Sequence, residues 1–169
     1  REFTVENVVR VGKGIAYYLK KKEKPQRELR VVIGYDTRFG GKLFAESLAI
    51  SLIEEEIDVL MDDHFTTTPM ISLASHKLDC DLGVIFTASH NPPSYQGLKI
   101  KGSYGGPAFD SMVQEIVDLI PEKVSLPHNQ EYESLKSHTR LTKVDLDLLY
   151  TETIIQRFDL GALKKDQKH

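Results

Sequence analysis

This sequence has little of what marks secreted, membrane-spanning or nucleic-acid-binding chains. Its single cysteine, Cys80, excludes an internal disulfide, and the apolar residues around it predict a buried, unreactive thiol. No apolar run is long enough to cross a bilayer, and no secretory signal peptide is recognisable. The formal net charge of only -3 implies no broad attraction to nucleic acid or to an anionic membrane. We therefore expect a cytoplasmic chain that binds neither nucleic acid nor membranes.

What the sequence does contain is sufficient for one globular domain. Its 169 residues are 40% hydrophobic and 28% charged, as in ordinary globular proteins. A chain of this length buries roughly 70% of the surface that its unfolded form exposes. The hydrophobic core alone is therefore expected to stabilise the fold, without disulfides or metal ions.

Strand and helix patterns alternate along most of the chain. Short apolar strands are predicted at residues 29–34, 57–61, 82–86 and 97–101, and amphipathic helices at residues 5–22, 44–53, 69–74, 112–120 and 145–158. In the first helix, Gly12 and Gly14 either weaken the helix or allow it to pack closely against a neighbour. The alternation predicts an α/β fold, a three-layer α/β/α domain with a mixed, mostly parallel sheet. Residues 121–139, in contrast, are polar and are predicted to be irregular.

The loop after the third predicted strand carries the strongest functional signal. Residues 87–93 read Thr-Ala-Ser-His-Asn-Pro-Pro, and they follow the end of a strand, where open α/β sheets bind their ligands. The two prolines restrict their own φ angles and keep the preceding residues extended, so the loop is expected to be stiff. A stiff loop that presents Ser89 suits phosphoryl transfer, which depends on positioning and electrostatic stabilisation.

Two other interpretations of this loop remain open on composition alone. The residues are common in turns, and Ser89 and Asn91 could simply bond to backbone groups. A serine hydrolase is a weaker alternative, because the sequence has no Gly-x-Ser-x-Gly elbow.

Three basic side chains lie in segments near this loop. Lys99 follows Ser89 by ten residues, and it would approach the same cleft if the strand at residues 97–101 returns beside its predecessor. Lysine can act as a general base, although Lys99 and Lys101 could also be plain surface residues. Arg38 follows the first strand and is suited to phosphate recognition, or it forms a clamp with Asp36 that orders its own turn.

These motifs resemble the phosphohexomutases, the phosphoglucomutase/phosphomannomutase family. Residues 87–93 with Tyr-Gln-Gly-Leu-Lys at residues 95–99 resemble the family's active-site signature, and Gly-Tyr-Asp-Thr-Arg at residues 34–38 resembles a second motif. Residues 2–8 and 105–108 resemble further family segments. The resemblance covers residues 2–120 with specific motifs and continues more weakly to the end. Gln96 departs from the asparagine that is usual there, while keeping the amide chemistry.

The resemblance implies a role for each of the site residues. Ser89 would be the phosphoserine that donates its phosphoryl group to a hexose phosphate and gives a bisphosphate intermediate. His90 and Lys99 fall on acid/base or substrate-contacting positions. Arg38 and Asn91 would bind substrate or support the site. The family also implies Mg2+, with one ligand from the phosphate on Ser89, and hexose 1,6-bisphosphate as an activator.

The resemblance also implies that the chain is part of a longer enzyme. We assign residues 1–140 to the family's domain I, without its first strand, and residues 141–169 to a helix and linker toward an absent second domain. The metal loop and the substrate-phosphate grip belong to other domains of the parent chain, so we expect this chain alone to be inactive. The parent would interconvert hexose 1-phosphate and hexose 6-phosphate. The alternative is a sugar-phosphate-binding or interaction domain of a non-catalytic relative.

Overall fold

A five-stranded sheet forms the centre of the structure, a computed structural model that describes residues 3–22 and 27–158. Where the predictions extend to residues 1–2 and 159–169, they lie outside the described residues. The elements along the chain are α1 (Val5–Lys21), β1 (Arg30–Tyr35), α2 (Gly41–Ile53), β2 (Asp58–Met61), α3 (Thr68–Lys77), β3 (Leu82–Phe86), β4 (Leu98–Gly102), α4 (Asp110–Asp118), α5 (Asn129–Leu135), β5 (Leu141–Lys143) and α6 (Leu146–Arg157).

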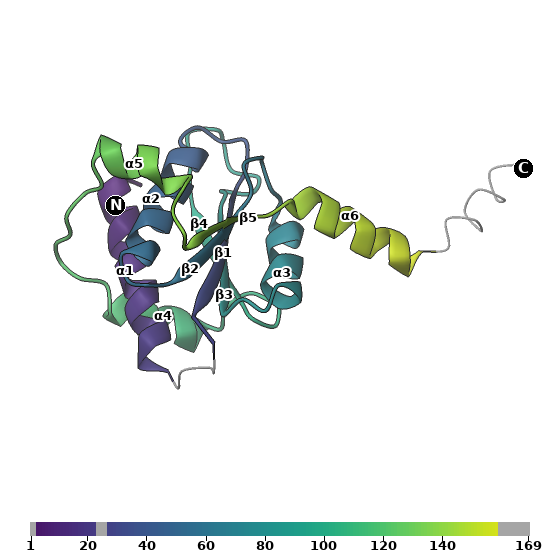
Figure 1. The fold of residues 1–169 in the computed structure, drawn as a ribbon, viewed down its shortest axis with the longest axis horizontal. Coiled ribbons are helices and arrows are strands. Elements are labelled where there is room, and N and C mark those ends of the chain that lie inside the picture. The colour runs from purple at the N-terminus through teal and green to yellow at the C-terminus, as the bar shows by residue number, and fades with distance from the viewer. Residues whose placement is uncertain (1–2, 23–26, 159–169) are drawn as a thin grey trace, which may run out of the picture.

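The strands lie in the order β4-β3-β1-β2-β5, and only β4 runs antiparallel to its neighbour among these five strands. Helices α1, α2, α4 and α5 cover one face of the sheet, while α3 and the start of α6 lie on the other (Figure 1). The predicted three-layer α/β/α fold with a mixed, mostly parallel sheet is confirmed. No helix in the described ranges combines the length and the apolar character that a membrane crossing requires.

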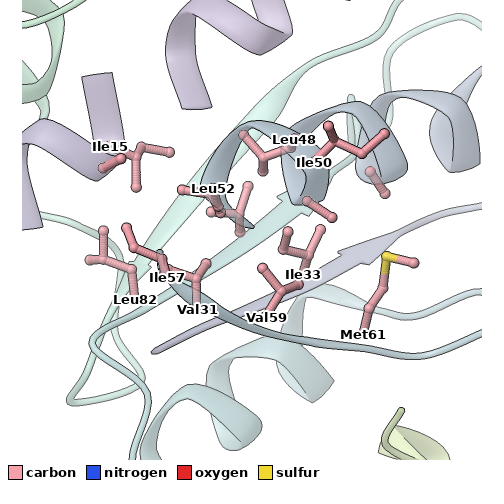
Figure 2. Close-up of a cluster of buried hydrophobic side chains, with 14 of the residues drawn as sticks. Ile15, Val31, Ile33, Leu48, Ile50, Leu52, Ile57, Val59, Met61 and Leu82 are labelled. Carbon is pink, nitrogen blue, oxygen red and sulfur yellow. The ribbon is translucent and has the colours of Figure 1, made fainter. Parts of the chain in front are cut away.

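The larger core lies between the sheet and α1 and α2. Side chains of β1, β2 and β3 meet those of the two helices in a fully apolar cluster (Figure 2). Val31, Ile33 and Val59 are completely buried there. Burial on both faces explains why these strands appear in the sequence as continuous apolar runs rather than as alternating patterns.

Gly12 lets α1 and α2 approach each other closely. A Cβ atom at this position would lie 1.9 Å from the Oγ atom of Ser51 and 3.0 Å from a methyl carbon of Leu48. Of the two interpretations of this glycine, close packing is therefore the correct one, and the helix continues through it from Val5 to Lys21.

The C-terminal part contains two elements that the sequence patterns did not predict. Helix α5 lies within the segment expected to be irregular. Its sequence, Asn-Gln-Glu-Tyr-Glu-Ser-Leu, is mostly polar and only Leu135 is buried, so it gives no apolar helical pattern. Strand β5 extends the sheet beside β2, although residues 141–169 were expected to form a helix and linker. Its three residues include one apolar side chain, too few to give a strand pattern.

Candidate functional site

The site is built where β1 and β3 end side by side. Tyr35 and Phe86, the last residues of the two strands, are paired in the sheet. The N–H of Asp36 donates to the carbonyl of Phe86 at 3.0 Å and holds the two following loops together at their start. Burial, with smaller contributions from nearby carboxylates, raises the pKa of Tyr35, whose hydroxyl donates to the carbonyl of Asp63 at 2.9 Å.

Ser89 lies in an exposed and conformationally unusual position. Its φ angle of 56° is in the left-handed region, which a serine rarely adopts. Its N–H donates to the hydroxyl of buried Thr87 at 3.1 Å, and the N–H of Asn91 donates to the carbonyl of Ala88 at 3.1 Å. The Ser89 side chain is therefore presented to solvent from a tight, internally bonded turn.

A second turn follows directly and completes the Ser89 loop, which we define as residues 87–97. Here the N–H of Tyr95 donates to the carbonyl of Pro92 at 3.0 Å, and the N–H of Thr87 donates to the carbonyl of Gly97 at 3.0 Å. The loop thus leaves β3 and returns toward β4 with bonds across its base. The stiffness expected from Pro92 and Pro93 is supported by these additional contacts.

Arg38 reaches across from the neighbouring loop and binds the backbone of the Ser89 loop. Its Nη2 atom donates to the carbonyls of Ser89 at 2.8 Å and Asn91 at 2.6 Å. Its Nη1 atom donates to the carbonyls of Pro92 at 2.8 Å and Tyr95 at 3.1 Å. The predicted contact between Asp36 and Arg38 is also present, but the main partner of the guanidinium is the Ser89 loop.

Lys99 lies on β4, which pairs with β3 as predicted for a returning strand. It is opposite Ile85, one residue before the end of β3, so it is close to the edge from which the Ser89 loop begins. Leu98 and Ile100 pack against the core on the α1 side, which places exposed Lys99 on the face that α3 covers. Lys101 shares this face, two residues farther from the site.

The structure therefore brings four of the five predicted residues into one loop cluster. Ser89, His90 and Asn91 are exposed neighbours, and Arg38 contacts the backbone of two of them. Lys99 approaches the same edge from the adjacent strand.

Two supporting residues were not identified from the sequence. Thr87 accepts from the N–H of Ser89, and the Thr-x-Ser spacing typical of such a turn was its only signal. Gln96 donates through Nε2 to the carbonyl of Phe39 at 3.4 Å and so connects the two loops. No local pattern could have predicted that contact, because its partners are 57 residues apart.

The described residues do not supply a metal site of their own. Nowhere in residues 3–22 and 27–158 do three His, Cys, Asp or Glu side chains come together as ligands would. A phosphate on Ser89 would be a single oxygen ligand, whereas Mg2+ prefers several.

Comparison with known proteins identifies the family to which this chain belongs. Residues 1–126 match the family described as phosphoglucomutase/phosphomannomutase, alpha/beta/alpha domain I. The chain belongs to the phosphoglucomutase/phosphomannomutase family. It is 31% identical over 164 residues to a phosphoglucomutase/phosphomannomutase of Thermococcus kodakarensis, with 97% of this chain and 34% of that protein covered. It is 33% identical over 129 residues to a phosphoglucomutase of Staphylococcus saprophyticus, with 76% and 22% covered.

A solved structure of the family has the same fold. The crystal structure of a candidate phosphomannomutase from Thermus thermophilus superposes with a TM-score of 0.81 at 31% identity, covering 96% of this chain and 34% of that chain. This domain I chain thus spans 22% to 34% of the length of the two curated relatives named above.

Proposed function

We propose that this chain is the phosphoserine domain of a longer enzyme that interconverts hexose 1-phosphates and hexose 6-phosphates. Ser89 carries the phosphoryl group. The observation that supports this role is the exposed position of Ser89 at the carboxyl end of β3. Ser89 lies there on a loop of two consecutive turns, and Arg38 binds the backbone of this loop. Ligands of open α/β sheets bind at this edge. We further propose that the parent enzyme is cytoplasmic.

In the proposed reaction, a phosphoryl group passes from Ser89 to the hexose phosphate, and another returns to Ser89. A free hydroxyl of the hexose phosphate attacks the phosphorus on Ser89, the bond to the serine oxygen breaks, and a hexose bisphosphate forms. The proton of the attacking hydroxyl goes to a base, and the serine oxygen gains a proton. The bisphosphate then returns its other phosphoryl group to Ser89 by the reverse step, and the isomeric monophosphate leaves. Hexose 1,6-bisphosphate therefore suffices to load the serine initially.

His90 and Lys99 are the proposed proton carriers or substrate contacts. His90 directly follows Ser89, and Lys99 lies on the adjacent strand near the same edge. Lysine and histidine are both able to take a proton from an attacking hydroxyl when they are positioned within hydrogen-bond reach. Asn91 belongs to the same turn and supports it through its backbone.

Mg2+ would neutralise charge on the transferred phosphoryl group, but the described residues of this chain supply only part of its ligand set. The phosphate on Ser89 is the one ligand that this chain offers from its described residues, and the remaining ligands would come from other parts of the parent. For the same reason we expect the isolated chain to be inactive as a mutase. Residues that hold the sugar phosphate would also have to come from those parts.

The test is phosphorylation and turnover with a matched serine control. In the full-length parent, incubation with glucose 1,6-bisphosphate should add one phosphoryl group, which peptide mass spectrometry locates at Ser89. Ser89→Ala should abolish this adduct and the conversion of glucose 1-phosphate in a coupled assay with Mg2+. Ser94→Ala, in the same exposed loop, should leave both intact.

The opposite results would reject the proposal. A full-length protein that never acquires the adduct would favour a non-catalytic sugar-phosphate-binding relative. Robust turnover by residues 1–169 alone would contradict the expectation that the rest of the parent is required.

A further inference from the structure

We propose that Arg38 is a positioning residue that holds the Ser89 loop and does not bind the substrate phosphate. The proposal concerns the site described above, and its kinetic part rests on the proposed function. Its structural part can be tested on this chain without any substrate.

The guanidinium of Arg38 has no donor to spare. An arginine side chain carries five N–H groups. Four of them donate to the carbonyls of Ser89, Asn91, Pro92 and Tyr95, at 2.6 to 3.1 Å. The fifth, on Nε, faces the carboxylate of Asp36 at 3.4 Å, and the side chain is only 13% exposed. A phosphate could bind Arg38 only by displacing bonds that already hold the loop.

Arg38 adds donors to a loop that is short of backbone N–H groups. The peptides after Asn91 and Pro92 lead into prolines and therefore have no N–H group. The loop therefore has two backbone donors fewer for its carbonyls. Arg38 donates to the carbonyls of Asn91 and Pro92, and the carbonyl of Pro92 also accepts from the N–H of Tyr95. Because the other two acceptors lie in the flanking turns, a single planar group connects both turns of the loop.

The same contacts explain how Ser89 keeps its left-handed conformation. A serine with φ of 56° persists only when its surroundings determine its backbone. Thr87 binds the N–H of Ser89 and Arg38 binds its carbonyl, so both peptide groups of this residue are held. In the planar trans peptide, the carbonyl that faces Arg38 leaves the N–H of His90 pointing the opposite way.

Arg38 is itself anchored to the strand from which the Ser89 loop starts. The carboxylate of Asp36 accepts from the N–H of Arg38 at 2.9 Å, and the N–H of Asp36 donates to the carbonyl of Phe86. Asp36 therefore fixes the position of Arg38 relative to the end of β3. We expect that loss of the Arg38 contacts changes the conformation of Ser89. Lysine could not replace it, because an ammonium group is a compact donor that cannot reach acceptors on both turns.

The first experiment compares amide exchange in the substrate-free chain. NMR should show that exchange of the bonded Ser89, Asn91 and Tyr95 amides accelerates about tenfold or more in both Arg38→Met and Arg38→Lys. Arg140→Met is the matched control. It removes an arginine–aspartate pair with Asp58, at the amino end of β2, and should leave the three amides unchanged. Unchanged exchange in both Arg38 variants would overturn the proposal.

A measurement on the wild-type chain covers the case in which an Arg38 variant does not fold. The four Nη–H protons should give separate NMR signals at low temperature, because their bonds to four carbonyls oppose rotation of the guanidinium. A single averaged signal that titrates with inorganic phosphate would show a free, anion-binding arginine and would overturn the proposal.

The second experiment measures kinetics in the full-length parent. A positioning role predicts that Arg38→Met lowers kcat about tenfold or more while KM stays within about twofold, and that Arg38→Lys does not restore kcat. A higher KM with unchanged kcat, partly restored by lysine, would show phosphate binding and would reject positioning. If Ser89 never becomes phosphorylated, the proposed function fails separately, and the amide-exchange result still decides the structural claim.

Discussion

The buried carboxylate of Asp62 accepts a hydrogen bond from the N–H of Leu146 at 2.8 Å, across 84 residues of sequence. Its other oxygen accepts from the N–H of His64 at 2.9 Å. Leu146 is the first residue of α6, and its side chain is buried in the core on the α3 side of the sheet. One aspartate directly after β2 therefore attaches the start of α6 to the domain.

Asp62→Ala should weaken this attachment and the whole fold. It leaves the buried N–H of Leu146 without its acceptor, which should lower the free energy of unfolding by about 1–3 kcal/mol. Chemical denaturation would measure the loss, and hydrogen exchange should show faster opening of the first turn of α6. Asp147→Ala changes an exposed carboxylate of the same turn and should cost only about a few tenths of a kcal/mol. Equal losses of stability in the two variants would show that Asp62 does not hold the start of α6.

Gly34→Ala should destabilise the end of β1 because there is no room for a methyl group. Its Cβ atom would lie 2.1 Å from Oγ1 of Thr66 and 2.7 Å from a methyl carbon of Ile71. The backbone of Thr66 is held by its N–H, which donates to the carbonyl of Tyr35 at 2.8 Å, and its buried side chain has little room to rotate away. We expect a loss of about 1–3 kcal/mol in the free energy of unfolding.

The control for this substitution is a double-mutant cycle. Gly34→Ala should cost clearly less in a Thr66→Ala background, where the nearest clashing atom is gone. Equal costs in the two backgrounds would show that the clash with Thr66 is not the cause.

Lys99 and Lys101 form a matched pair for testing the acid/base assignment. Both lie on the α3 side of β4, but only Lys99 is near the carboxyl end of β3. In the full-length parent, Lys99→Met should lower kcat/KM by about 100-fold or more, within the range of general acid–base catalysis. Lys101→Met should change it less than about threefold. A similar loss in both variants would point to general surface charge instead.

Cys80 should make the stability of the domain fall at high pH. Burial raises the pKa of this thiol from its ordinary value of 9.0 to about 12. Between these values the unfolded chain ionises the thiol and the folded chain does not, so rising pH favours unfolding. Below pH 9.0 the contribution of the protonated Cys80 thiol to the free energy of unfolding is fully present, and it is lost as the pH approaches about 12.

Comparison of the wild type with Cys80→Ala isolates this effect from the titration of other groups. The difference between their free energies of unfolding should be constant below pH 9.0 and should shift against the wild type above it. A difference that does not change between about pH 8 and about pH 11 would contradict the buried, protonated thiol. In the folded chain at about pH 8, the thiol should also resist a disulfide reagent until denaturant is added.

Elements with strong local patterns were predicted well. The strand predicted at residues 82–86 coincides with β3 (Leu82–Phe86), because five buried residues in succession leave no polar interruption. The loop that follows was identified through its composition, since hydroxyls and prolines after a buried strand are a local signal. Helix α5 and strand β5 were missed because each buries little apolar surface.

The sequence by itself determined the family, the alternation of strands and helices, and the presence of Ser89 on a proline-containing loop. These depend on neighbouring residues, whose periodicity and conformational limits act before the chain folds. Only the tertiary structure decided that Arg38 binds the Ser89 loop and that Asp62 holds α6. The partners in those contacts are 51 and 84 residues apart, and they meet only because the packed sheet places the ends of its strands together.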